Sequence, residues 1–239
     1  MHRAGRHGAG DCDWLQDRRA VDIRDVHAIT LNRVKAYLVL EAELSLIDCG
    51  YARSLPGIAR AIDEQGRSIR ELARVVCTHG HPDHAGAARE LALEGIPILM
   101  HPADGATLAT TWHHAFRRPS RGRIFAAMTP EPPEIVPIED GQVLPILGGL
   151  EVVHVPGHTP GSVCLYGRRD RVLFVGDALQ RRFGRVGYAS TLYSDDVVAA
   201  REAVKRLAAL DVETIVFSHY PPLTEGATET LAALARRRE

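Results

Sequence analysis

One nine-residue segment constrains this chain more than any other feature of its sequence. Residues 78–86 read Thr-His-Gly-His-Pro-Asp-His-Ala-Gly and directly follow a short apolar run, residues 74–77, that predicts a buried strand. The segment therefore places three imidazoles and one carboxylate within six residues, namely His79, His81, Asp83 and His84. Imidazole and carboxylate are ligands for zinc, iron and manganese. This spacing indicates a metal site, whereas a single histidine would more often be a polar residue of a surface loop.

Three further polar residues follow later strand-like runs. His158 comes after the run 150–155, Asp177 after 172–175 and His219 after 214–217. In layered α/β folds, sites form beyond the carboxyl ends of strands. Each residue taken alone could instead be a hydrogen-bonded structural group. Taken with the first cluster, the three residues predict that four strand ends bring seven ligands to one place.

The order of strand and helix signals predicts an α/β fold. Two blocks of strands, each followed by helices, favour helices packed outside two face-to-face sheets in a single domain over residues 26–239. Residues 1–25 are expected to be a poorly ordered N-terminal extension. The proline-containing stretch 103–140 is expected to be an excursion that forms a lid or a pocket wall. Strands are expected at 26–31, 36–41, 44–49, 74–77, 96–100, 143–146, 150–155, 162–166, 172–175 and 214–217.

Helices are expected at 55–65, 85–94, 104–114, 195–210 and 227–237. Asp83 and His84 are expected to open the helix 85–94. Ser194 or Asp195 is the expected N-cap of the helix 195–210, because serine and aspartate side chains accept hydrogen bonds from the first free N–H groups of a helix.

Composition excludes several classes of partner. The chain has 239 residues, a formal net charge of -1 and 45% apolar residues, so it lacks the basic surface of a nucleic-acid-binding protein. No apolar run approaches the roughly 20 residues that cross a bilayer, so no membrane partner is expected. The four cysteines form no C-x-x-C pair, which fits a reducing, cytoplasmic compartment. We expect a small-molecule substrate and a monomer or homodimer.

The ordered set of motifs resembles the metallo-β-lactamase superfamily, in particular its small generic metallohydrolases of the glyoxalase II-like or lactonase-like branch. The resemblance covers residues 26–223 and includes the run Leu-Ile-Asp-Cys-Gly at 46–50. It implies a four-layer αββα sandwich with the site along one edge of the two sheets. It also implies one metal on His79, His81 and His158, a second on Asp83, His84 and His219, a bridging Asp177, and an Asp48 that orients a ligand histidine.

The resemblance implies a metal-dependent hydrolase. Two divalent ions, zinc in the first place and iron or manganese otherwise, would share a bridging hydroxide that attacks an ester-type bond: a thioester, a lactone or a phosphoester. Asp83 would orient this nucleophile and shuttle its proton. Asp177 argues against a true β-lactamase, because those enzymes have no bridging carboxylate at this place. Gln180 stands where the quorum-lactone hydrolases carry tyrosine, and the segment after His219 is short for a hydroxyacylglutathione hydrolase.

Four residues are candidates for the substrate pocket. Arg181 could receive an anionic group or belong to a solvated basic turn. Trp112 and His114 could line the pocket from a lid or pack on the sheet. Tyr220 follows the last ligand where glycine is more usual in the family, and we expect it to narrow the pocket.

Two other functions stay open. One is a mononuclear iron sulfur dioxygenase on the same fold, which this chain resembles at Gly-Asp-Ala-Leu 176–179 and at Gly184-Arg185. The other is a binding module that has kept the fold without catalysis. A complete set of ligands argues against such a module.

Overall fold

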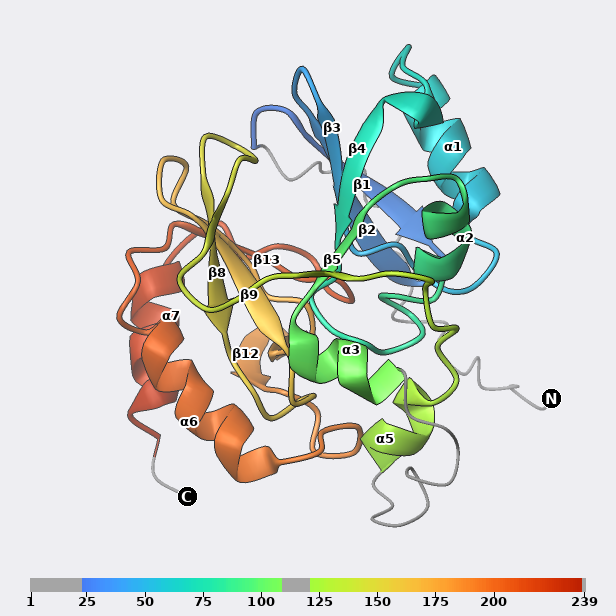
Figure 1. Ribbon diagram of the computed structural model, residues 1–239. Helices are drawn as coiled ribbons and strands as arrows, with labels where there is room; N and C mark the ends of the chain where they lie inside the picture. Colours follow the sequence, from blue (N-terminus) through green and yellow to red (C-terminus); the bar gives the residue numbers. More distant parts are fainter. Residues whose placement is uncertain (1–22, 109–120, 238–239) are drawn as a thin grey trace, which may run out of the picture.

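A computed structural model of the protein describes residues 23–108 and 121–237, which form two large β-sheets, a two-stranded hairpin and flanking helices (Figure 1). The first sheet has the order β1-β2-β3-β4-β5-β6 and the second the order β13-β10-β9-β8-β7. The first comprises β1 (Val26–Leu31), β2 (Val34–Leu40), β3 (Leu44–Ile47), β4 (Leu72–Val76), β5 (Ile98–Met100) and β6 (Val136–Pro137). The second comprises β7 (Val143–Leu144), β8 (Leu150–His154), β9 (Val163–Gly167), β10 (Val172–Phe174) and β13 (Thr214–Val216).

α1 (Leu55–Asp63) and α2 (Ala88–Leu93) cover the outer face of the first sheet, and α6 (Val197–Leu207) and α7 (Ala227–Ala235) that of the second (Figure 1). α3 (Pro102–Leu108) and α5 (Arg121–Ala126) lie at one edge of the sandwich, and the 3-10 helix η2 (Ile69–Glu71) precedes β4. In α1, Ile58 and Ile62 lie four residues apart and are both buried, which is the spacing of one helix face. The described helices include none that is long and apolar enough to span a membrane.

Three layers of apolar side chains hold the sandwich together. One cluster fills the space between the first sheet and α1 and α2, and a second lies between the second sheet and α6 and α7. The third joins the two sheets: Tyr37 and Val76 of the first pack with Leu165 and Phe174 of the second. The predicted αββα order is therefore confirmed, because each sheet buries one face on helices and the other on its partner sheet.

Strand direction brings the carboxyl ends of several strands to one edge. β3, β4 and β5 are mutually parallel, and β10 is parallel to β13. β8 and β10 are both antiparallel to β9, so they also share a direction. The polar residues that follow β3, β4, β8, β10 and β13 therefore leave the sheets at the same edge of the sandwich.

Two expected helix starts were wrong. α2 begins at Ala88, so Asp83 and His84 belong to a turn, in which the N–H groups of His84 and Ala85 both donate to the carbonyl of His81. Close packing at Gly86 holds this turn against the segment that follows β3. A Cβ at this position would lie only 2.5 Å from the backbone nitrogen of Ala52. The cap of α6 is Asp196, whose side chain accepts from Ala199 N, because its extended backbone is the conformation that an N-cap needs.

The excursion 103–140 contains more regular structure than the sequence predicted. It contributes most of α3, all of α5, and β6, which pairs in parallel with β5 at the edge of the first sheet. Pro137 is tolerated in β6 because an edge strand has one side without a partner. The predicted helix 104–114 runs beyond the described residues, which do not include 109–120. A hairpin of β11 (Leu179–Arg182) and β12 (Arg185–Tyr188) forms where a basic turn was one expectation.

Candidate metal centre

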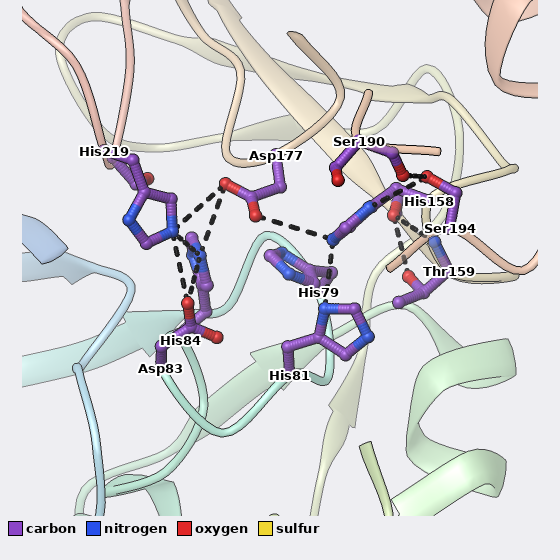
Figure 2. A network of polar contacts seen from close by, with 12 residues as sticks. His79, His81, Asp83, His84, His158, Thr159, Asp177, Ser190, Ser194 and His219 are labelled. Atoms are coloured by element: carbon purple, nitrogen blue, oxygen red, sulfur yellow. Dashed lines mark hydrogen bonds and ion pairs between the residues drawn. The ribbon is translucent and has the colours of Figure 1, made fainter. Parts of the chain in front are cut away.

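Seven side chains converge at the shared edge of the two sheets as two adjacent groups (Figure 2). Within each group, one potential ligand atom from every member lies within 4.8 Å of the others. Together the groups contain the seven residues that the sequence predicted, and Asp177, which the resemblance implies as a bridge, falls into the second group. The first group is His79, His81 and His158, and the second is Asp83, His84, Asp177 and His219.

The first group consists of neutral imidazoles. His79, His81 and His158 are each 1% exposed. Burial lowers the pKa of all three, to about 4 for His81 and about 3 for His158, because a charged ring is disfavoured away from water. Nδ1 of His81 lies 3.0 Å from Nε2 of His158. At neutral pH each of these rings therefore carries a single proton, and one of its two nitrogens offers a lone pair.

The second group combines two histidines with two carboxylates. Nε2 of His219 lies 3.1 Å from Oδ2 of Asp83 and 3.2 Å from Nε2 of His84. Burial lowers the pKa of His84, but the carboxylates of Asp48, Asp83 and Asp177 outweigh it and hold the pKa well above its ordinary value. The pKa of His219 is also raised, since Asp177 and Asp83 outweigh its burial. This group therefore attracts positive charge.

Asp177 faces both groups at once (Figure 2). Its Oδ2 lies 3.6 Å from Nε2 of His158, whereas its Oδ1 lies 3.5 Å from Nε2 of His84 and 3.4 Å from Nε2 of His219. Burial raises the pKa of this carboxyl, but His219, His84 and His158 hold it well below its usual range. Asp177 is therefore an ionised carboxylate between the two groups.

Hydrogen bonds behind the first group fix which ring nitrogen carries the proton. The Ser194 hydroxyl donates to the carbonyl of Ser190 at 2.6 Å, so its oxygen is free to accept from Nδ1 of His158 at 3.2 Å. In the same way, the Thr78 hydroxyl donates to Asp48 and can accept from Nδ1 of His79 at 3.1 Å. Both rings then carry their proton on Nδ1 and present the lone pair of Nε2 to the site.

The histidines of the second group are held similarly. Nδ1 of His84 lies 2.7 Å from Oδ2 of Asp48, which also accepts from Thr78 N at 2.8 Å through its other oxygen. Nδ1 of His219 faces the carbonyl oxygen of Arg33 at a longer 3.4 Å. Asp48 thus stands behind a ligand histidine, in the arrangement that the family resemblance implies. Both Nε2 atoms again point into the site.

These residues fit a metal ion. Nε2 of His79 is buried without a hydrogen-bond partner in the part of the chain that the structure describes. Leaving such an atom unpaired costs about 1–3 kcal/mol, which a bound cation would offset. Zinc–nitrogen bonds of about 2.0–2.1 Å hold two ligand nitrogens a little over 3 Å apart, close to the separations seen here.

The structure describes two of the four candidate pocket residues, Arg181 and Tyr220. The Arg181 side chain donates to the carbonyls of Pro221 and Pro222, so its guanidinium supports the loop after His219. Tyr220 is partly buried, and its ring packs 6.2 Å from that of Phe217 and 6.4 Å from that of His219. Trp112 and His114 lie outside the described residues.

Sequence reasoning gave no site role to Thr78, Ser190 or Ser194, although Thr78 opens the histidine-rich segment and Ser194 was one of two expected N-caps. No local pattern marks such a residue as the support of a histidine, because a serine or threonine next to a loop or helix is common. Only their position behind a histidine gives them a role.

The family model of the metallo-β-lactamase superfamily matches residues 29–219. The chain belongs to this superfamily. The predicted resemblance is thus confirmed at the level of the superfamily, whose members bind divalent metals.

Two curated relatives and one solved structure are similar over much of the chain. "Probable metallo-hydrolase YflN" of Bacillus subtilis is 27% identical over 246 residues, which cover 90% of this chain and 91% of that protein. "Acyl-coenzyme A thioesterase MBLAC2" of Gallus gallus is 33% identical over 169 residues, covering 62% of this chain and 58% of the relative. The crystal structure of TTHA1623 in a di-iron-bound form has a TM-score of 0.62 and 29% identity, covering 88% of this chain and 98% of that one.

Proposed function

We propose that this chain is a hydrolase that holds one divalent metal ion in each ligand group and cleaves a thioester of a small molecule. The observation that carries the proposal is the position of Asp177, whose Oδ2 faces the first group and whose Oδ1 faces the second. Two-metal hydrolases keep their ions about 3.5–4 Å apart, a separation that one bridging carboxylate suits.

When bound, two such ions lower the pKa of a shared water and polarise the carbonyl oxygen of the substrate. The chain's own contribution is to fix the ligands before the ions arrive. Four Nδ1 atoms are engaged behind the site, so the rings need little reordering when their Nε2 atoms bind. His79, His81 and His158 would hold one ion and Asp83, His84 and His219 the other.

Asp83 has the geometry of a proton acceptor. Its Oδ2 contacts His219, while its Oδ1 is buried without a partner among the described residues. Burial raises the pKa of this carboxyl, but His84 and His219 outweigh it, so the pKa is lowered and Asp83 is ionised. We expect Oδ1 to orient the attacking water, accept its proton and pass it to the leaving thiolate.

Two observations favour a thioester over a lactone or a phosphoester. One relative is named as an acyl-coenzyme A thioesterase at 33% identity. In addition, the Phe125 ring lies 5.3 Å from that of His81 and 5.6 Å from that of Tyr193, which is 43% exposed. This aromatic surface beside the first group offers an apolar neighbour for an acyl chain.

Metal content and thioester hydrolysis, measured on the same preparation, test the proposal. We expect two ions per chain, with zinc first and iron second because of the di-iron relative. Asp177→Asn should bind close to one ion and lose at least about 10³-fold in kcat/KM for acyl-coenzyme A thioesters, or roughly 4 kcal/mol. Asp140→Asn is the control, because this exposed carboxylate pairs with Arg206 outside both groups.

The opposite result would replace the proposal with the alternative chemistry. One iron per chain, unchanged in Asp177→Asn, together with oxygen consumption on a persulfide substrate, would identify a mononuclear dioxygenase. Two ions with hydrolysis of lactones or phosphodiesters alone would keep the metal centre and overturn the thioester assignment.

A further inference from the structure

A second buried carboxylate lies next to the metal centre without belonging to it. Asp104 sits in the first turn of α3 and is 1% exposed. Its Oδ2 accepts hydrogen bonds from Gly80 N and from the Thr159 hydroxyl, both at 2.7 Å. Its Oδ1 accepts from Gly161 N at 2.6 Å. A buried carboxylate is costly unless it is paired or hydrogen-bonded, and here three donors compensate for the burial.

These donors come from two separate loops. Gly80 lies between His79 and His81, on the loop that follows β4. Thr159 lies directly after His158, on the loop that follows β8. Asp104 therefore joins the two chain segments that supply the first ligand group, although it contacts none of the three histidines itself.

The surrounding chain is shaped for this contact. At Gly161 a Cβ would lie 2.6 Å from Asp104 N and 2.7 Å from Oδ1, so a larger residue would push α3 away from the loop. The carbonyl oxygen of Gly80 is held from the other side by the Thr129 hydroxyl at 2.8 Å. Both the N–H and the C=O of Gly80 are thus fixed by residues of the excursion 103–140.

We propose that Asp104 is a positioning residue that sets the distance between the His79–His81 pair and His158, and through it the metal affinity of the first ligand group. The link acts on two backbone N–H groups and on the Thr159 hydroxyl, and not on the imidazoles. It therefore fixes the positions of the chain segments that carry the imidazoles and not the protonation of the rings. The loss of this link should therefore lower the metal affinity of the first group. None of the four residues of the second group donates a hydrogen bond to Asp104.

Asp104→Asn tests this link with little change in shape. If the amide oxygen faces Gly80 and Thr159, the amide NH2 group meets the N–H of Gly161, and two donors then oppose one another. We expect the affinity of the first group to fall 10- to 100-fold, the usual range for a residue behind the ligands, and the second group to keep its ion. Thr159→Val removes only one donor and should give a smaller loss in the same group.

The experiment is a Co²⁺ titration of the metal-free full-length variants, followed by visible absorption and by dialysis with elemental analysis. Thr228→Val is the matched control, because its hydroxyl bonds to Val212 N and O at 3.0 and 2.8 Å and neither residue belongs to a ligand group. Weaker binding of one Co²⁺ in Asp104→Asn and Thr159→Val, but not in Thr228→Val, supports the proposal.

Two results would overturn it. The first is a lower melting temperature with both Co²⁺ affinities and the absorption bands unchanged, which would make Asp104 a purely structural residue. The second is an equal loss of both ions. If Asp104→Asn does not fold, Thr159→Val decides the question alone, and unchanged Co²⁺ affinity in that variant rejects the link.

The inference rests on the two-group metal centre of the proposed function but not on the reaction. A wild-type protein that binds two Co²⁺ ions and hydrolyses no ester would refute the proposed hydrolase and leave the role of Asp104 testable. A wild-type protein that binds no Co²⁺ would refute both.

Discussion

The two ligand groups lie side by side, but the pKa values of their histidines are shifted in opposite directions. The first holds three buried imidazoles whose pKa values are lowered by burial, so they are neutral before any ion binds. The second holds carboxylates that raise the pKa of His84 and His219. Neutral ligands favour a cation only through their lone pairs, whereas the second group also attracts it by charge.

This difference has a consequence for metal binding. An ion that enters the first group displaces no proton from His81 or His158 at neutral pH. An ion that enters the second group competes with protons on His84 and His219, because ligand histidines must be neutral. The two groups should therefore differ in acid sensitivity, although Asp177 connects them.

Removing one histidine from each group should have the largest effect. His158→Ala should empty the first group and His219→Ala the second, each leaving one ion and lowering the affinity of the affected group more than 100-fold, beyond the range of indirect effects. His158→Ala should also destabilise the fold more, because His158 is 1% exposed and the His219 side chain 26%. Elemental analysis and thermal melting measure both, with His27→Ala as the control.

Either variant losing both ions would break the comparison. It would mean that the groups form one cooperative site, in which neither half holds an ion alone.

Lowering the pH should empty the groups in sequence. The raised pKa values of His84 and His219 mean that protons already compete with the metal in the second group at pH values above the ordinary histidine pKa of about 6.5. The first group should keep its ion to a lower pH, down toward the pKa of about 4 of His81. Dialysis from pH 8 to pH 4, followed by elemental analysis, should show an intermediate with one ion. His219→Ala should lose its single ion only in the lower range.

Simultaneous release of both ions at one pH would contradict this order. The electrostatic difference between the groups would then be abolished by the ions themselves.

Ser194→Ala should have the smallest effect and touch the first group alone. The change removes the acceptor of Nδ1 of His158, so the ring is less firmly held in the tautomer that presents Nε2. We expect a loss of up to about 10-fold in affinity, or about 1.4 kcal/mol. A zinc titration against a chelator measures it, and Ser194→Thr should restore the affinity because the hydroxyl returns. A loss in the second group instead would show that the groups share their supports.

Local signals predicted most strands and the identity of the seven clustered residues. The run before residue 78 became β4, and the runs before His158, Asp177 and His219 became β8, β10 and β13, since short β-branched and aliphatic runs have few other stable arrangements. The errors arose where tertiary contacts override local preference. The segment 85–87 contains two alanines, which favour a helix, but it is held in a turn by contacts around Gly86. β6 exists only because β5 offers it an edge.

The sequence by itself determined the ligand types, their order and the superfamily, because these depend on residue chemistry and spacing along the chain. The tertiary structure alone decided which atoms face one another. The two orientations of Asp177, the support of His158 by Ser194 and the three donors on Asp104 join residues far apart in sequence. Hydrogen bonds depend on separations of about 3 Å, and only the packing of two sheets and their loops sets such distances.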